Sequence, residues 1–343
     1  MHEQLICITQ GDPAGIGPEI VARLFRDSQQ LASGCFVAGD VACMRRAAGM
    51  IGVDGGMPVP VAQIDTPEQA KGVPPRCIPV LQAGPPAPPV TMGVVSAGAG
   101  RLAADAVVWA ARAALRGEVA AIVTAPLHKE ALAAAGVPFP GHTELLQAEA
   151  AAFAGQPVAQ VPVRMMLAND ELRTVLVSIH LSLRQAIEAV SQASVLETLR
   201  ITHRSLVALL GRAPRIALAG LNPHAGEGGL FGQEEIEHIA PAAQAARAEG
   251  MQVSGPYAPD TVFMRARTGE FDVVVAMYHD QGLIPVKYLG VEKGVNVTLG
   301  LPLVRTSPDH GTAFDIAGTG RADPSSLVAA VRMAWRLCRP PGP

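Results

Sequence analysis

Short apolar runs recur along the chain, and each is followed by a glycine-rich or polar turn and then by a longer amphipathic segment. Residues 5–9, 119–124 and 273–277 are runs of this kind, rich in β-branched side chains and too short for helices. The Ala-rich stretch 97–116 has the length and spacing of a helix. This alternation predicts an α/β fold with a doubly wound, mainly parallel sheet.

Three of the predicted strands lead into a histidine. They are the runs before His279 in FDVVVAMYHDQG, His180 in TVLVSIH and His224 in RIALAGLNPH. Because the carboxyl ends of parallel strands share one edge of a sheet, we expect the three imidazoles to meet on one divalent metal. Three nitrogen ligands suit zinc, cobalt, nickel or iron and leave room for a substrate. The alternative is that each histidine is a separate, hydrogen-bonded loop residue.

Other polar residues stand beside these runs. Lys287 and Arg305 are candidates for binding an anion, Arg305 by a bidentate contact and Lys287 as a point charge. The alternative for each is a surface salt bridge of little energetic value. Asp280 could orient His279 or contact the substrate. His142 precedes a predicted helix, where it is either a residue of the helix cap or a ligand contact.

The segment Gly11–Ile20, GDPAGIGPEI, is a shaped loop that feeds a helix. Its glycines have the spacing GxxxGxG, so it is neither a GxGxxG dinucleotide loop nor a P-loop. It either binds an anion through the amides at the head of the helix or is a structural turn. Gly98, Gly100 and Ala103 match GxGxxA, but their flanks continue a helical spacing, and we assign no cofactor there.

Composition narrows the class of protein. The 343 residues are 49% hydrophobic and 17% charged, which indicates a compact globular protein of two domains or one large one and excludes disorder and a coiled coil. A formal net charge of -3 argues against a nucleic-acid groove. No apolar run is long enough to span a membrane. The five scattered cysteines, without a CxxC pair, indicate reduced thiols in a cytoplasmic protein.

Long motifs carry a resemblance over almost the entire chain. GDPAGIGPEI, VTAPLHKEAL, GHTELL, GLNPHAGEGG, AMYHDQG and NVTLGLPLVRTSPDHGTAFDIAGTGRADP, in this order, resemble the 4-hydroxythreonine-4-phosphate dehydrogenase family of vitamin B6 synthesis. The last motif is also similar to the adenine-side loop of isopropylmalate and isocitrate dehydrogenases, which bind NAD(P) without GxGxxG. The resemblance therefore implies cofactor contacts from His310, Gly311, Thr312 and Asp315.

The same resemblance implies an architecture and a set of site residues. It implies two α/β/α domains around a cleft, one from residues 1–128 with 298–343 and one from 129–297. It implies a homodimer whose site takes one histidine from the partner chain, with His279 as the candidate. The metal, zinc, magnesium or cobalt, would lie on His180, His224 and His279, with Asp260 and Asp280 near the substrate. The implied substrate contacts are His142, Thr143, Lys287, Asn296 and Arg305.

The implied reaction is an NAD- or NADP-dependent oxidation of 4-phosphooxy-L-threonine, followed by decarboxylation to 3-amino-2-oxopropyl phosphate, a step toward pyridoxal 5'-phosphate. A metal would lower the pKa of the substrate alcohol and later stabilise the enolate. Lys287 and Asp280 are the candidates for the general base.

Other functions stay open. Relatives within the family oxidise 4-phospho-D-threonate or 4-phospho-D-erythronate, and the same anion-binding residues would serve those acids. Relatives that act on aromatic dihydrodiols are disfavoured because Thr143 and Arg305 are present. A metal-dependent hydrolase would not need the loop at His310–Gly320, and a non-enzymatic binding protein would have no use for a metal beside Lys287 and Arg305.

Overall fold

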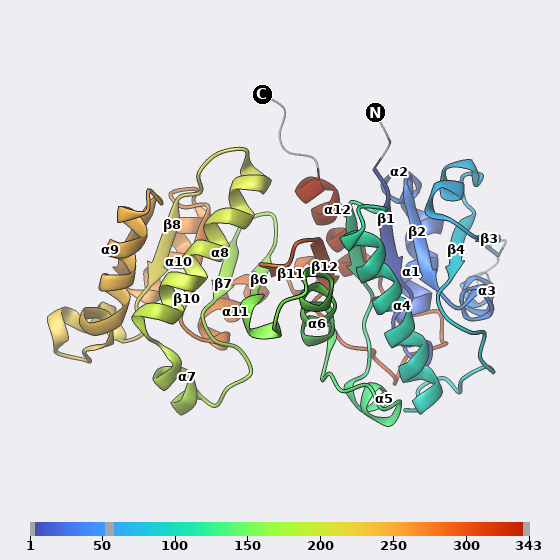
Figure 1. Ribbon diagram of the computed structural model, residues 1–343, viewed down its shortest axis with the longest axis horizontal. Helices are drawn as coiled ribbons and strands as arrows, with labels where there is room; N and C mark the ends of the chain where they lie inside the picture. The colour runs from blue at the N-terminus through green and yellow to red at the C-terminus, as the bar shows by residue number, and fades with distance from the viewer. Residues whose placement is uncertain (1–3, 52–57, 339–343) are drawn as a thin grey trace. The chain divides into compact units, whose positions relative to one another are not determined.

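The computed structural model describes residues 4–51 and 58–338, and the chain forms two compact units (Figure 1). Unit 1 contains the residues up to Pro162 together with Leu301–Cys338, and unit 2 contains Val163–Gly300. The first boundary lies after residue 162 instead of the expected 128. The reason is that the helices α5 (Lys129–Ala134) and α6 (His142–Ala154) pack against the long helix α4 (Ala97–Leu115) of unit 1.

Unit 1 is built on a parallel sheet in the order β3-β4-β2-β1-β5-β12. All residues of β1, β2 and β5 are buried, as expected for parallel strands covered on both faces. The strands are β1 (Ile6–Thr9), β2 (Cys35–Gly39), β3 (Val61–Ile64), β4 (Ile78–Gln82), β5 (Ala121–Thr124) and β12 (Val304–Pro308).

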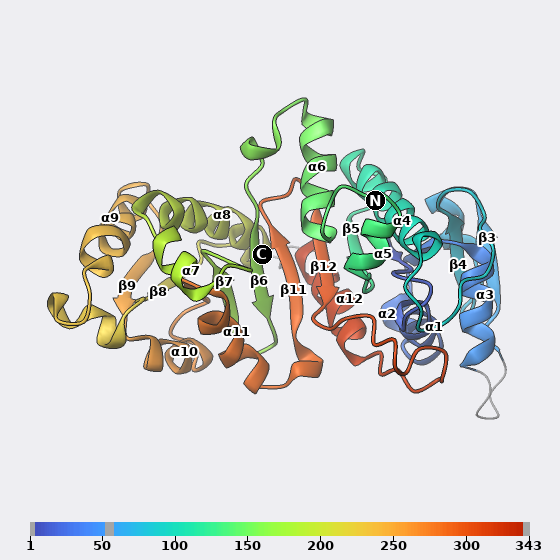
Figure 2. The same cartoon turned by 90° about the horizontal axis from the view of Figure 1, so that it is seen from below.

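Helices cover both faces of this sheet. Helix α4 lies on one face, and α1 and α12 lie on the other (Figure 2). The apolar side of α4 closes a core in which the rings of Phe36 and Trp109 meet edge to face at 5.9 Å. The remaining helices of unit 1 are α1 (Gly17–Asp27), α2 (Gln29–Ala32), α3 (Val41–Met50), α12 (Ser325–Cys338) and the short 3₁₀ segments η1 (Pro67–Gly72) and η2 (Val158–Gln160).

Unit 2 is built on a mixed sheet in the order β11-β6-β7-β10-β8-β9. The four strands from β7 to β9 in this order are parallel, whereas β6 is antiparallel to both β7 and β11. A short turn joins β6 to β7, and in it the side chain of Asn169 accepts hydrogen bonds from the amides of Glu171 and Leu172. The strands are β6 (Arg164–Ala168), β7 (Arg173–Leu176), β8 (Ile216–Ala219), β9 (Val253–Tyr257), β10 (Val273–Ala276) and β11 (Val295–Leu299).

Unit 2 is also a three-layer α/β/α sandwich. Helices α8 and α9 lie on one face of its sheet, and α10 and α11 lie on the other (Figure 2). The predicted α/β class with largely parallel sheets is therefore confirmed. The helices are α7 (Leu183–Ala189), α8 (Gln192–Leu210), α9 (Ala240–Ala248), α10 (Pro259–Arg267), α11 (His279–Tyr288), the π-helical η4 (Glu235–Ile239) and the 3₁₀ segments η3 (Pro223–Gly229) and η5 (Val291–Lys293).

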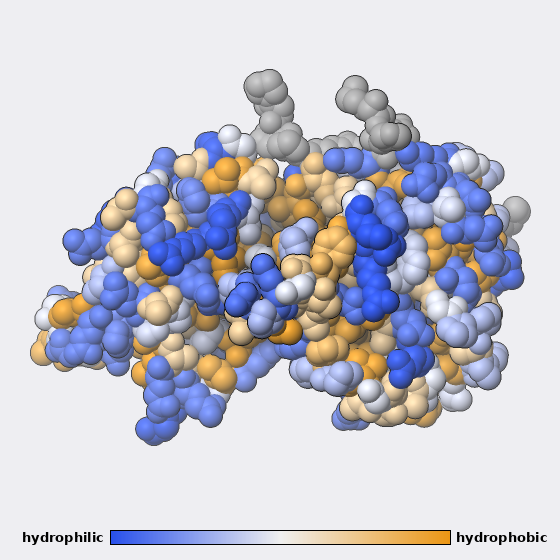
Figure 3. Space-filling view, viewed as in Figure 1, coloured by the Kyte–Doolittle hydropathy of each residue, from blue (hydrophilic) through white to orange (hydrophobic). Residues whose placement is uncertain are grey.

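The surface (Figure 3) and the helices of the described residues agree with the expectation of a globular protein without a membrane span. Figure 3 shows hydrophilic and hydrophobic residues interspersed over the face that it presents. Among residues 4–51 and 58–338, no helix is both long enough and apolar enough to cross a bilayer.

Candidate functional site

The three histidines follow three neighbouring strands of unit 2. In the order β7-β10-β8, His180 comes after β7, His279 is the first residue of α11 after β10, and His224 lies in η3 after β8. Because these strands are parallel, their carboxyl ends lie at one edge of the sheet. The three histidines thus follow three adjacent parallel strands, as expected from the sequence.

Two of the three rings are neighbours within one chain. The ring centroids of His180 and His279 are 5.8 Å apart. Since a metal–nitrogen bond is about 2 Å long, one cation between the rings could be reached by both with small side-chain adjustments. His180 has a positive φ of 52°, a strained conformation for a non-glycine residue and one that is common at functional sites.

His224 is not part of this pair. Its ring lies 6.2 Å from that of Phe231, and its backbone φ is also 52°. In the part of the chain that the structure describes, no group of three His, Cys, Asp or Glu side chains is arranged to hold a metal ion. Among the described residues of one chain, His180 and His279 are therefore neighbours, but the three histidines together do not form a metal-holding group.

A carboxylate stands behind one of the paired rings. Nδ1 of His279 lies 2.7 Å from Oδ1 of Asp280. A carboxylate at Nδ1 fixes the ring and its tautomer, so that Nε2 is the nitrogen available to a cation. Imidazoles supported in this way fit a divalent metal. Asp260, the other expected acid, is exposed in the first turn of α10.

The anion-binding candidate of unit 1 is Arg305, on β12. Its side chain is only 3% exposed, and its Nε and Nη2 atoms donate to Oγ1 of Thr124 at 3.1 and 2.7 Å. Burial lowers the pKa of Arg305 to about 10, while the carboxylate of Glu144 acts in the opposite direction. The guanidinium therefore stays charged at neutral pH. Because Arg305 is buried, it is not the residue of a surface salt bridge, which was the alternative considered from the sequence.

His142 stands close to this cation. It is the first residue of α6, and Gly141 is the N-cap. Burial, and next the charge of Arg305, hold the pKa of His142 well below its usual range. The buried Nε2 of His142 has no hydrogen-bond partner among the described residues. A neutral imidazole carries only one N–H, and the ring of His142 also bonds to the backbone of Ala125. Its unsatisfied Nε2 can therefore accept a hydrogen bond from a ligand hydroxyl, and Thr143 follows it in the same helical turn.

The other expected substrate residues belong to unit 2. Lys287 lies in the last turn of α11, and Asn296 lies in β11, where it is in register with Leu167 of β6. Both are partly buried.

The expected cofactor loop packs on the glycine-rich loop of unit 1. The carbonyl of Thr312 accepts a hydrogen bond from the amide of Ile16 at 3.0 Å, and a Cβ on Gly15 would lie 2.9 Å from the same oxygen. Gly15 thus has a structural reason to be glycine. Of the other expected contacts, His310 lies against the carbonyl of Gly311, and Asp315 is exposed.

Unsatisfied polar atoms collect around these two loops. Oδ2 of Asp12, Nδ1 of His128 and Nε2 of His310 are buried without a hydrogen-bond partner among the described residues. The ring of His128 stacks on Phe314 with centroids 4.8 Å apart. Buried polar atoms normally have partners, so this region fits a ligand rich in hydroxyl and amide groups, such as a dinucleotide.

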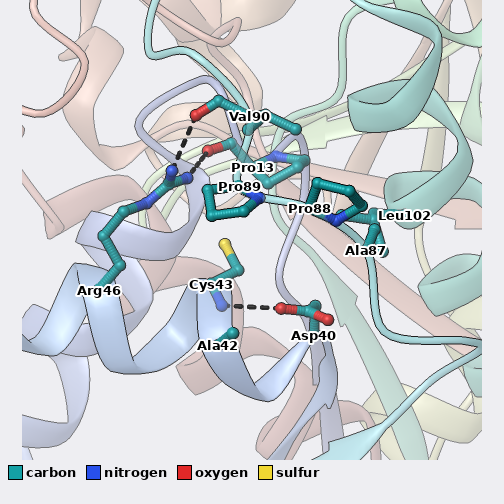
Figure 4. A pocket seen from close by; sticks show the side chains of 10 residues that line it. All are labelled: Pro13, Asp40, Ala42, Cys43, Arg46, Ala87, Pro88, Pro89, Val90 and Leu102. Carbon is teal, nitrogen blue, oxygen red and sulfur yellow. Dashed lines mark hydrogen bonds between the residues drawn. The ribbon is translucent and has the colours of Figure 1, made fainter.

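A separate cavity of about 120 Å³ lies beside the glycine-rich loop in unit 1 (Figure 4). Prolines 13, 88 and 89 and the side chain of Cys43 line it. Arg46 at its rim donates to the carbonyls of Val90 and Pro13 at 2.8 and 2.9 Å. Arg46 therefore links two loops through hydrogen bonds from its guanidinium to their backbone carbonyls.

Sequence reasoning missed two residues that support the site. Thr124 holds Arg305, and Glu235 holds the loop that carries His224. The only sequence signal for Thr124 is its place at the end of a predicted strand. Glu235 gives no local signal, because its partners lie thirteen and fourteen residues before it.

Comparison with known proteins identifies the family of the chain. Residues 31–334 match the family model described as "Pyridoxal phosphate biosynthetic protein PdxA". The 4-hydroxythreonine-4-phosphate dehydrogenase of Beijerinckia indica is 53% identical over 98% of this chain and 96% of its own. The D-threonate 4-phosphate dehydrogenase of Salmonella typhimurium is 45% identical over 98% and 100%.

A solved structure adds the fold. The 4-hydroxythreonine-4-phosphate dehydrogenase of Klebsiella pneumoniae superposes with a TM-score of 0.87 at 41% identity, covering 98% of this chain and 100% of its own. These matches extend over nearly the whole length of both partners. The chain therefore belongs to the PdxA family of pyridoxal phosphate biosynthetic proteins.

Proposed function

We propose that the protein is a metal-dependent dehydrogenase that oxidises 4-phosphooxy-L-threonine with NAD and releases 3-amino-2-oxopropyl phosphate and carbon dioxide. A relative that is 53% identical over 98% of the chain carries the name 4-hydroxythreonine-4-phosphate dehydrogenase. The structural observation that carries the proposal is the pair His180 and His279 with Asp280 behind it. That pair offers divalent-metal chemistry at the carboxyl edge of a parallel sheet.

The reaction moves a hydride from the alcohol carbon to the nicotinamide and a proton from the alcohol oxygen to a base. The resulting β-keto acid then loses its carboxylate as carbon dioxide. A divalent cation, when bound, would polarise the reacting oxygen. Asp280 keeps the ring of His279 in one orientation, and this engagement leaves Lys287 as the candidate base.

We assign the substrate's anionic groups to the positive residues. Arg305, with Thr143, would bind the phosphate or carboxylate, and neutral His142 would accept a hydrogen bond from a substrate hydroxyl. Lys287 and Asn296 would contact the rest of the substrate. A buried guanidinium recognises such groups strongly, because little solvent competes for its donors. Asp260 is an exposed acid and is assigned a role near the substrate only through the family resemblance.

We assign the nicotinamide cofactor to the loop with His310, Gly311, Thr312 and Asp315. The buried, unpartnered nitrogen of His310 supports this assignment. NAD is favoured over NADP only by the resemblance, and a comparison of the two cofactors tests it.

We propose that the metal site is completed between two copies of the chain, as a homodimer. Among the described residues of one chain, His180, His224 and His279 do not form a group that could hold a metal ion, which supports this. Large apolar side chains are also exposed on unit 2: Leu183 on α7 is 60% exposed, Leu230 after η3 is 73% and Tyr288 on α11 is 90%. Five free cysteines, three of them buried, support a reducing, cytoplasmic location.

A second candidate substrate is 4-phospho-D-threonate. Relatives named D-threonate 4-phosphate dehydrogenase are 42% and 45% identical over nearly the whole chain. This acid keeps the phosphate and the carboxylate, so the same positive residues would bind it.

One experiment separates these functions. The purified protein is incubated with a fixed divalent metal, NAD or NADP, and each phosphorylated acid, and the absorbance of the reduced cofactor is followed. We expect the highest kcat/KM with 4-phosphooxy-L-threonine. A higher value with the threonate would reverse the choice of substrate, and no reduced cofactor with any acid would overturn the dehydrogenase function.

A further inference from the structure

The segment that carries His224 has an unusual backbone. Five consecutive residues have left-handed φ values: His224 at 52°, Ala225 at 54°, Gly226 at 80°, Glu227 at 44° and Gly228 at 68°. Three of them have side chains, for which this region is unfavourable. Such a run persists only where the surrounding structure imposes it, and it is found at functional sites.

One buried carboxylate holds the start of this segment. Glu235 is 3% exposed, and its Oε1 accepts hydrogen bonds from the amides of Leu221 and Asn222 at 2.7 and 2.8 Å. Its Oε2 accepts a hydrogen bond from Nδ2 of Asn222 at 2.9 Å. These bonds fix the two residues that lead from β8 into the turn at His224.

The same carboxylate also packs against the segment itself. A Cβ on Gly226 would lie 2.8 Å from one oxygen of Glu235, and a Cβ on Gly220 would lie 3.1 Å from the other. The glycines therefore let the backbone approach Glu235 closely on both sides of His224.

The helix that carries Glu235 is irregular at this point. Glu235–Ile239 forms a π-helical turn before the regular helix α9 begins. Single π-turns are rare and cluster at functional sites, because they shift the direction of one side chain. Two independent departures from regular backbone thus meet at Glu235 and the His224 loop.

We propose that Glu235 is a positioning residue that sets the orientation of His224 for a divalent metal. The inference rests on the proposed function in one respect, namely that His224 is a metal ligand. If Glu235 only stabilised the fold, its replacement would lower the melting temperature but leave the metal affinity of the folded protein unchanged.

The variants are Glu235→Gln and Glu235→Ala, with Glu234→Gln as the matched control. Glutamine keeps one oxygen for the two amides but presents its own donor to Nδ2 of Asn222. Glu234 is the adjacent acid and also accepts from Nδ2 of Asn222, at 2.7 Å, whereas the amides of Leu221 and Asn222 donate to Glu235. The control therefore removes a similar charge from the same neighbourhood.

The probe is Co²⁺, bound to the metal-free full-length protein well below each melting temperature. Its dissociation constant is measured by calorimetry and its coordination by the visible absorption spectrum. We expect the dissociation constant to rise by about 10-fold in Glu235→Gln and by up to about 100-fold in Glu235→Ala, as for other residues that orient metal ligands. Glu234→Gln should remain within about 2-fold of the wild type.

The outcomes are distinguishable. A folded Glu235→Gln protein with the wild-type affinity and spectrum would overturn the inference and leave the metal site standing. If the wild-type protein binds no Co²⁺, both the metal assignment and the inference fail. Hydrogen exchange gives a second measurement: the amides of Leu221 and Asn222 should exchange faster in Glu235→Ala, which removes their acceptor, than in Glu234→Gln, and equal rates would overturn the inference.

Discussion

Arg305 donates two hydrogen bonds, from Nε and Nη2, to the single hydroxyl oxygen of Thr124. Both bonds lie on one edge of the guanidinium, so they fix its plane and its rotation. A hydroxyl oxygen is uncharged, and it therefore orients Arg305 without neutralising it. A carboxylate in the place of Thr124 would orient the group equally well but would compete with an anionic substrate.

Thr124→Val should weaken substrate binding. Valine has the shape of threonine without the hydroxyl, and a hydrogen bond to a charged group contributes about 1.5–3 kcal/mol. We expect KM for the phosphorylated acid to rise by about 10-fold or more, with a smaller change in kcat, and calorimetry to show weaker substrate binding. Thr124→Ser should restore most of the affinity because it returns the acceptor. An unchanged KM in the valine variant, or no recovery with serine, would contradict this role.

The depressed pKa of His142 should make the protein sensitive to acid. In the unfolded chain this histidine takes up a proton near its ordinary pKa of about 6.5, whereas in the folded protein it does so only at a lower pH. Below about pH 6.5 the unfolded state therefore binds more protons than the folded state, and the free energy of unfolding falls. The slope from one such group is at most about 1.4 kcal/mol per pH unit.

His142→Gln removes this group and leaves the other titrating residues in place. The free energy of unfolding of the variant, from urea titrations, should fall less steeply than that of the wild type between pH 6.5 and 5. At pH 8, where His142 is neutral in both states, the difference in slope should vanish. Parallel curves over the acid range would show that His142 does not carry this dependence.

His279→Ala should abolish turnover while leaving the fold intact. The side chain is 38% exposed and follows a strand that is buried without it, so little packing is lost. Metal content should fall with the activity, whereas the circular dichroism spectrum and melting temperature should change little. His203→Gln, within helix α8, is the control and should keep its metal and its activity. Turnover near the wild-type level after removal of the metal by a chelator would refute the metal mechanism.

The positions of the histidines could be predicted because the signal is local. A β-branched run that ends at His279 must be a buried strand, and parallel strands place their ends together. The partners of these groups could not be predicted in the same way. Thr124 is 181 residues from Arg305 in the sequence. Glu235 is 14 residues after Leu221, whose amide donates to it, and the loop of His224 lies between them. Tertiary packing alone brings such pairs together.

The boundary between the two units also depends on tertiary contacts that the sequence does not reveal. The segment 129–162 contains two helices with no pattern that distinguishes one unit from the other. Its place in unit 1 depends on the contact of α5 and α6 with α4. Gly98 and Gly100 of α4 are also indistinguishable in the sequence, where both belong to the GxGxxA match, but in the structure only Gly100 has a close neighbour.

Gly100 is required by the crossing of α4 and α5, and Gly98 is not. A Cβ on Gly100 would lie 1.9 Å from the carbonyl oxygen of Ala131, whereas a Cβ on Gly98 would meet no atom within 4 Å. Gly100→Ala must therefore push the two helices apart, and we expect it to lower the free energy of unfolding by about 1–3 kcal/mol or more. Gly98→Ala should raise it by about 0.5–1 kcal/mol, because alanine loses less backbone entropy in a helix.

The pair of variants tests helix packing against cofactor binding. Denaturant titrations measure both stabilities, and calorimetry with NAD measures the affinity of the folded proteins. If the two glycines formed a dinucleotide loop, both alanine variants would lose NAD affinity and their stabilities would change little. Opposite changes in stability, with NAD affinity kept in Gly98→Ala, are expected if α4 is a packing helix, because only Gly100 faces a neighbouring backbone.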